Sequence, residues 1–281
     1  MSMRQRVVAI ALATAACSLL AQTAFPEAAP PGKPLSLDLG KRLTMDFIYI
    51  QAGTFLMGND KGGKADQDEM PVHQVRISRP FHLGKYEVTQ EQWQAVMGEN
   101  PALFKGQAVV RENPGRLKGA GNPVESVSWD ECQTFLAKLG EKFPGKKFRL
   151  PTEAEWEYAC RAGTKTRFSF GDDPEEVQVL SYGWYARNAS GGHRPVGTKL
   201  PNPWGLFDMH GNVWEWCQDW YGPYSKADPK DPTGPATGEF RVVRGGSWYL
   251  DRPGSLRSAT RYRAKPDATF YNVGLRVLLA P

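Results

Sequence analysis

The stretch Gly205-Leu-Phe-Asp-Met-His-Gly-Asn-Val-Trp-Glu-Trp216 places two carboxylates, two glycines and two tryptophans close together. Asp208 and Glu215 lie beside turn backbone, and a calcium ion uses such groups because it takes about six to eight oxygen ligands, carbonyls among them. Trp214 and Trp216 are large, so we expect one of them to anchor a hydrophobic core. The alternative interpretation is a turn between two strands, with a buried aromatic pair and two solvated acids.

Three helix starts can be predicted from capping residues. Thr89, Ser128 and Thr152 each precede a helical pattern, and a Gln or Glu three residues after Thr89 and Thr152 completes a capping box. The first helix should end at Gly98 and the second at about Lys142.

Short strands are predicted between and after these helices. They cover residues 47–50, 53–57, 72–77, 241–243 and 274–279, and residues 164–240 are predicted to be aromatic-rich loops with short strands. The 29 Gly and 22 Pro favour long connections, and nine Trp with ten Tyr can bury enough area to hold them together. A few helices among many short strands predict an α+β fold.

The composition disfavours several classes of function. The formal net charge is +5 and no basic run occurs, so nucleic-acid binding is not expected. No phosphate-binding glycine loop or dinucleotide fingerprint is present. The four His form neither an HExxH nor an HxxxH pair, and Ser247 does not lie in a G-x-S-x-G elbow.

The first residues have the pattern of a secretory signal. Arg4 and Arg6 precede an apolar run over residues 7–20, and small residues follow at 21–24. We therefore expect a signal peptide at 1–24, a Pro/Ala-rich linker at 25–43 and one domain at 44–281. Lipoprotein anchoring through Cys17 is a weaker alternative, because it would truncate the apolar run, and an uncleaved anchor ranks third. No transmembrane segment is expected in the mature chain, and the expected compartment is the periplasm or the outside.

Export permits disulfides. Cys132, Cys160 and Cys217 would remain after cleavage, so at least one thiol would be free or paired between chains. Cys132 and Cys160 belong to helical stretches, and we expect them to be buried structural thiols.

The stretch at 205–216 resembles the signature of the formylglycine-generating enzyme (sulfatase-modifying factor) family, and six further blocks of that family appear in order along the chain. The resemblance covers about residues 44–279 and implies a C-type-lectin-like fold. The other blocks are GTFLMG (53–58), FHLGKYEVTQ (81–90), NPVESVSW (122–129), RLPTEAEWEYA (149–159), RGGSW (244–248) and NVGLR (272–276).

The resemblance also implies structural calcium. A second family calcium would map to Asn188 and Ala189, but the family's acidic ligand has no clear match in this loop, and Asn188 is equally typical of a simple turn. The ligands of the first site would be the side chains of Asp208 and Glu215 and the carbonyls of Gly211 and Val213.

The family's oxidation of a substrate cysteine depends on two enzyme cysteines that bind copper(I), a soft ion that prefers thiolates. These lie three and eight residues after the serine of the Gly-Gly-Ser motif. Counted from Ser247, the positions are Leu250 and Ser255. Leucine cannot bind a metal and a neutral hydroxyl is a poor ligand for a soft ion, so copper-dependent formylglycine formation is not expected.

The same region would surround the family's substrate groove. Aromatic rings beside Arg and Asp suit a peptide or an aromatic, partly charged ligand. Three arginines, Arg244, Arg261 and Arg276, are instead expected to connect loops, and the Glu-rich helix at 153–157 is expected to be a solvated face. The candidate groove residues are Trp214, Ser247, Tyr249, Asp251 and Arg252.

Three functions follow from these observations. The first is a periplasmic binding protein that holds a protein or peptide partner. The second is an oxidoreductase that acts on a peptide siderophore precursor, as cysteine-lacking relatives do in pyoverdine maturation. The third, and weakest, is formylglycine generation through other ligands.

Overall fold

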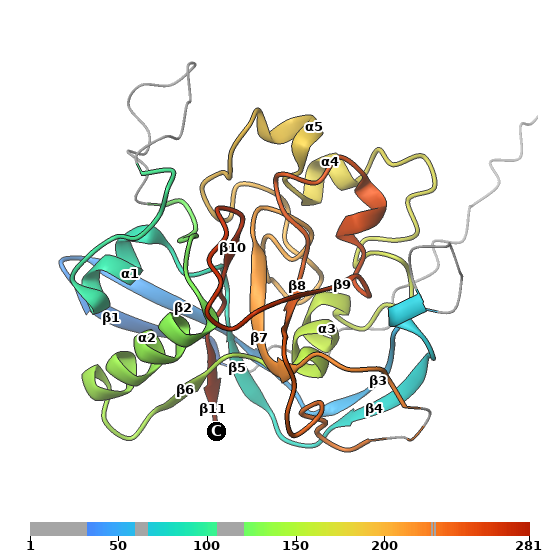
Figure 1. Ribbon diagram of the computed structural model, residues 1–281, viewed down its shortest axis with the longest axis horizontal. Helices are drawn as coiled ribbons and strands as arrows, with labels where there is room; N and C mark the ends of the chain where they lie inside the picture. Colours follow the sequence, from blue (N-terminus) through green and yellow to red (C-terminus); the bar gives the residue numbers. More distant parts are fainter. Residues whose placement is uncertain (1–32, 60–66, 106–120, 226, 228) are drawn as a thin grey trace, which may run out of the picture.

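The computed structural model describes residues 33–59, 67–105, 121–225, 227 and 229–281. The signal peptide expected at 1–24, with Cys17, lies outside them. Figure 1 shows three sheets with helices against them and long connections toward one end of the molecule. Among the described residues, no helix has the length and apolarity needed to cross a membrane.

The largest sheet has five strands in the order β1-β2-β5-β11-β6. Its first strand lies within the segment 25–43. Leu37 and Leu39 are buried in the core, and this burial fixes β1 against β2. The strands are β1 (Leu35–Gly40), β2 (Leu43–Ile50), β5 (Phe81–Gly84), β6 (Lys147–Arg149) and β11 (Leu278–Ala280).

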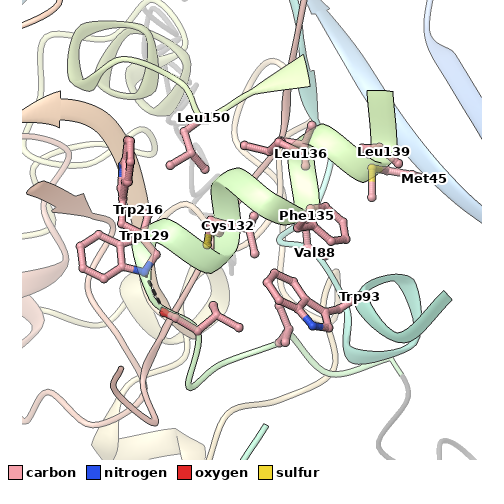
Figure 2. Close-up of a cluster of buried hydrophobic side chains, with 14 of the residues drawn as sticks. Met45, Val88, Trp93, Trp129, Cys132, Phe135, Leu136, Leu139, Leu150 and Trp216 are labelled. Carbon is pink, nitrogen blue, oxygen red and sulfur yellow. Dashed lines mark hydrogen bonds between the residues drawn. The ribbon is translucent and has the colours of Figure 1, made fainter. Parts of the chain in front are cut away.

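Two helices cover this sheet, α1 (Gln90–Met97) and α2 (Trp129–Lys142). Both begin with the capping residues predicted from the sequence, and α1 ends at Gly98 in a left-handed conformation. Figure 2 shows the inner face of α2 among other core side chains. Phe135 stacks on Trp93 with ring centroids 4.8 Å apart, which joins the two helices.

The second sheet has four strands in the order β10-β7-β8-β9, and a separate hairpin pairs β3 with β4. The strands predicted at 47–50 and 53–57 are both present, in β2 and β3, but they belong to different sheets. Likewise, the strand expected at 274–279 is divided between β10 and β11. The elements are β3 (Gly53–Met57), β4 (His73–Ile77), β7 (Trp214–Trp220), β8 (Arg241–Arg244), β9 (Arg261–Ala264) and β10 (Val273–Gly274).

The remaining elements are short. Helix α3 (Glu153–Arg161) begins at the predicted Thr152 cap and contacts β3, β4, β7 and β8. Within the predicted loop region 164–240, the chain also forms two helices of one turn each. These two helices are α4 (Val179–Tyr182) and α5 (Ala186–Ala189). Outside this region, short 3-10 turns occur at Gln67–Glu69 and Pro253–Leu256. Helices and antiparallel strands in separate layers confirm the α+β class.

The Glu-rich face of α3 is buried, so the prediction of a solvated face is wrong. Glu157 is fully buried and contacts both Arg161 and Arg244. Burial opposes ionisation of Glu157, but these two guanidinium groups outweigh it and lower the pKa of the carboxyl. Glu153 accepts a bidentate contact from Arg261, at 2.6 and 2.8 Å. The acids were misread because their partners are distant in the sequence.

Replacing Glu157 with Gln should destabilise the fold strongly. The change removes one charge from a buried ionic group and leaves the guanidinium of Arg244 without its main counter-charge, which costs about 3 kcal/mol or more. The matched change Glu141→Gln, at an exposed position of α2, should alter the free energy of unfolding by less than about 0.5 kcal/mol. Urea unfolding of both variants measures the difference, and equal midpoints would contradict the assignment.

Candidate functional site

The RGGSW block forms a tight reversal directly after β8. Gly245 and Gly246 have φ values of +99° and +79°, which side-chain-bearing residues rarely adopt. A Cβ on Gly246 would also lie 2.4 Å from a methyl carbon of Leu256. The reversal brings Trp248 back to the 205–216 stretch, where the backbone N–H of Trp248 donates to the carbonyl of Asn212 at 2.8 Å. The two blocks therefore form one continuous site.

Four aromatic side chains, which we call the aromatic cluster, meet at this reversal: Phe104, Trp248, Tyr249 and Tyr271. Tyr249 contacts Trp248 and Tyr271 edge to face, at 5.6 and 5.5 Å between centroids. Phe104 contacts Trp248 in the same way at 5.6 Å. Tyr249 is 57% exposed although its ring is held on two sides. The cluster thus presents a supported aromatic ring to solvent.

Polar atoms beneath the aromatic cluster are incompletely paired. Trp248 is buried, yet its Nε1 has no hydrogen-bond partner among the described residues. His193 lies edge to face against Phe104 at 5.7 Å, and its Nε2 is 3.7 Å from the Glu125 carboxylate, beyond hydrogen-bond distance. An unpaired buried indole donor is rare in folded proteins, so this region is the least satisfied part of the aromatic cluster.

The candidate groove residues do not all share this surface. Ser247 is buried and accepts a hydrogen bond from Asn272 Nδ2 at 3.1 Å, while Asp251 and Arg252 are exposed beyond Tyr249. Trp214 was expected in the groove but belongs to the main hydrophobic core, where it stacks on Tyr262. Trp214 is therefore 5% exposed, and its ring is covered by Tyr262 of strand β9, which explains the difference.

Residues at the two family cysteine positions offer no metal ligand of the required kind. Leu250 packs partly against the core, and Ser255 lies in the 3-10 turn after it. The three cysteines in the described residues are free and fully buried. Burial raises the pKa of Cys160 to about 12 and those of Cys132 and Cys217 well above their ordinary value. These thiols are therefore protonated and inaccessible.

A second part of the site is a buried group of three carboxylates around one guanidinium. Glu215 accepts a bidentate contact from Arg276, with distances of 2.7 to 3.1 Å, and a hydrogen bond from Trp156 Nε1 at 2.7 Å. Burial, followed by the charges of Asp208 and Glu215, raises the pKa of Glu87 well above its ordinary value. Burial likewise raises the pKa of Asp208 to about 6. When all three acids are ionised, their negative charge exceeds the positive charge of Arg276 and the nearby Lys199.

This geometry fits only part of the predicted calcium site. Asp208 Oδ2 accepts the N–H of Gly197 at 2.7 Å, but Oδ1 is buried without a partner and can serve a cation. The oxygens of Glu215 are already fully occupied by Arg276 and Trp156, so Glu215 does not fit as a ligand. No group of three or more His, Cys, Asp or Glu side chains suited to a metal occurs in the described residues.

The second calcium site expected at Asn188 and Ala189 fits poorly. The Asn188 side-chain oxygen accepts the N–H of Tyr185 at 2.9 Å, and its amide donates to the carbonyls of Leu180 and Gly183. The side chain therefore caps the start of the short helix α5. Its role is structural, in agreement with the turn alternative.

Sequence reasoning missed Glu87, Phe104, His193 and Tyr271. Glu87 accepts the backbone N–H of Val213 at 3.0 Å and a hydrogen bond from Asn212 Nδ2 at 2.6 Å. It therefore fixes the turn in the 205–216 stretch. The one available signal was its place between Tyr86 and Val88 in the FHLGKYEVTQ block, where an acid interrupts an apolar run. The other three come from loops without a recognisable pattern.

A separate cavity of about 290 Å³ lies beside β7 and holds Asp219, Glu153, Tyr224 and Arg261 in its wall. Asp219 accepts the backbone N–H of Glu153 at 2.9 Å. Burial, together with the nearby Glu153 carboxylate, raises the pKa of Asp219 to about 8. Asp219 is therefore largely protonated in the folded protein at neutral pH.

Asp219 should make the protein less stable as the pH rises. The unfolded chain loses this proton at about pH 4, and the folded protein keeps it to about pH 8, so the free energy of unfolding falls across that interval. The Asp219→Asn variant should lose this part of the pH dependence and exceed the wild type in stability at about pH 9. Thermal unfolding across the pH range, with exposed Asp267→Asn as control, measures this; parallel curves for all three proteins would refute it.

Comparison with known proteins agrees with this architecture. The sequence model of the sulfatase-modifying factor enzyme 1-like domain matches residues 38–281. A formylglycine-generating enzyme of Streptomyces coelicolor is 32% identical, over 84% of this chain and 89% of its own length. A serine/threonine-protein kinase pkn1 of Chlamydia pneumoniae is 34% identical over 82% of this chain, which spans only 37% of that relative.

Two solved structures share the fold. Treponema denticola variable protein 1 has a TM-score of 0.78 and 31% identity, covering 88% of this chain and 99% of its own. PvdO from Pseudomonas aeruginosa has a TM-score of 0.74 and 28% identity, covering 89% and 100%. The C-type-lectin-like fold expected from the sequence is thereby confirmed. The chain belongs to the sulfatase-modifying factor (formylglycine-generating enzyme-like) family.

Proposed function

We propose that this protein is an exported binding member of its family, which holds a protein or peptide partner at the aromatic cluster. The observation that carries the proposal is the exposed ring of Tyr249, supported by two aromatic neighbours, in the segment where thiols would be needed for copper chemistry. Export rests on the charged and apolar pattern of residues 1–24. Finding the full-length protein in the cytoplasmic fraction would contradict that part.

The chemistry around Tyr249 suits a polypeptide. Residues that dominate binding energy at interfaces are most often aromatic or Arg, and their surroundings are polar. Asp251 and Arg252 are exposed beside Tyr249 and provide charges of both signs. The sequence neighbours of the cluster, Leu103 and Phe270, are also exposed, at 66% and 38%. An extended apolar surface with a polar margin is typical of a peptide-binding face.

A photo-crosslinking amino acid at position 249 should capture a discrete partner in cells. The control position is Glu141, which is exposed on α2, away from α5 in Figure 1. Leu250, next to Tyr249, accepts the N–H of Ala186 in α5. We expect an adduct of one defined mass from position 249 only, and Tyr249→Ala should reduce recovery of that partner about tenfold or more. The same adducts from both positions, or none, would reject the proposal.

The protein should not generate formylglycine. A Cys-x-Pro-x-Arg peptide incubated with the protein, copper and oxygen should keep its mass, because no accessible thiol exists at the reaction position. The Streptomyces coelicolor relative serves as the positive control. Conversion of the peptide by this chain would show that other residues support the oxidation.

An oxidoreductase acting on a siderophore precursor is the second candidate. The similarity to PvdO favours it, since the whole of that chain aligns with this one. Under this alternative the aromatic cluster would hold the precursor instead of a protein partner. Deleting the gene separates the two proposals: unchanged siderophore fluorescence removes the oxidoreductase.

We also propose one structural calcium ion, held by Asp208 with the carbonyls of Gly211 and Val213 and without Glu215. The excess of buried negative charge and the unpartnered Asp208 Oδ1 support it. Calcium would supply positive charge that orders the turn.

Millimolar calcium after chelation should raise the melting temperature of the wild type by several degrees. Asp208→Asn should lose most of this response, whereas the exposed Asp267→Asn control should keep it. Metal analysis of the purified protein gives the stoichiometry directly. An equal response of all three proteins would place the ion elsewhere.

A further inference from the structure

A second cavity, of about 310 Å³, lies between β3, the end of α3 and the segment after the 3-10 turn at Pro253–Leu256. Its wall includes four cationic side chains, Arg161, Lys165, Arg167 and Arg257, and among the residues that the structure describes it includes no acidic one. The wall shares no residue with the aromatic cluster. Whatever binds in this cavity is therefore independent of the function proposed above.

Two of the four cations form a fixed, buried base. Arg161 is 5% exposed and donates to Glu157 at 2.8 Å and to the carbonyl of Gly58 at 2.8 Å. Arg257 is 8% exposed and contacts the Glu69 carboxylate at 2.8 Å. Both carboxylates contact these guanidinium groups from outside the cavity wall. The base is rigid because its charges are held in place before any ligand arrives.

The other two cations lie nearer to solvent. Lys165 is exposed and Arg167 is half-buried. The recorded side-chain contacts of Arg167, within the described residues, are a long hydrogen bond to the carbonyl of Asp172 at 3.5 Å and the Phe168 ring at 5.5 Å. The Asp172 carboxylate accepts the backbone N–H of Arg167 instead. Positive charge at the mouth is thus less compensated than at the base.

The wall also has a bare backbone section and an apolar section. Gly58 has a φ of +93°, and a Cβ there would lie 2.4 Å from the carbonyl oxygen of Glu69, so only glycine fits. Leu56, Val72 and Ala259 supply apolar surface. Such a combination suits an anion that carries a small organic group, since a bare inorganic ion would leave the apolar wall uncovered.

We propose that this cavity binds a phosphate monoester, with the phosphate at Lys165 and Arg167 and the organic group against Leu56 and Val72. A monoester carries close to two negative charges at neutral pH, matching the two cations at the mouth. Arg recognises phosphate through paired N–H donors, which a lysine alone cannot provide.

Calorimetry with phenyl phosphate tests the proposal, with phenyl sulfate, inorganic phosphate and phenol as comparison ligands at constant ionic strength. The variant Lys165→Ala/Arg167→Ala removes only the two mouth cations and should keep the wild-type melting temperature. The control Lys138→Ala/Lys142→Ala removes two exposed cations from α2. We expect phenyl phosphate to bind wild type and control equally and the first variant about tenfold more weakly, with affinity falling as salt rises.

Three results would overturn the proposal. One is equal affinity in all three proteins, which would place binding elsewhere. Another is no binding of phenyl phosphate to the wild type at millimolar concentration. The third is equal affinity for phenyl sulfate and phenyl phosphate, since a singly charged ester should bind more weakly at a site with two cations. Tighter binding of phenyl phosphate than of inorganic phosphate supports the apolar section of the wall.

Discussion

The bidentate contact between Glu215 and Arg276 ties together segments that lie far apart in the sequence. Glu215 belongs to β7. Arg276 also donates to the carbonyl of Gly84, at the end of β5, and to that of Phe207 in the 205–216 stretch. Trp156 adds α3 through its indole N–H. Loss of either charged partner would leave the other buried and unpaired, at a cost of about 3 to 5 kcal/mol. One ionic contact therefore orients both larger sheets and the helix beside them.

Buried ion pairs take over a role that regular secondary structure has in other folds. Arg244 donates to the carbonyls of Ala259 and Ser258, and Arg261 to that of Asp68, so guanidinium groups satisfy loop backbone that no strand could pair. Loops held in this way can change at their tips without loss of the interior. The aromatic cluster lies on connections outside the helices and strands, which is how one scaffold can serve relatives with different chemistry.

Local signals in the sequence were sufficient for the helices, because a cap and its partner lie within four residues. The Thr89, Ser128 and Thr152 caps are all present, and so are the buried cysteines of α2 and α3. Sequence patterns did not predict the environment of a residue whose contact partner is remote in the sequence. Glu157 looks solvated until Arg244, 87 residues away, is placed beside it. The core position of Trp214 depends in the same way on Tyr262, a ring on β9 that is 48 residues away in the sequence. The surface cluster was only partly predictable, since Phe104 and Tyr271 come from unrelated loops.

The position of β11 has a consequence for how the chain acquires its structure. This strand lies between β5 and β6, with Leu278 aligned to Leu83 on one side and to Arg149 on the other. Both neighbouring strands are synthesised long before β11. During translation, the backbone groups that pair with β11 therefore stay unpaired until residue 280 has left the ribosome. Pairings over such long separations form slowly and expose apolar edges meanwhile. Completion of the largest sheet is consequently a late event, because it follows the synthesis of every other strand in that sheet.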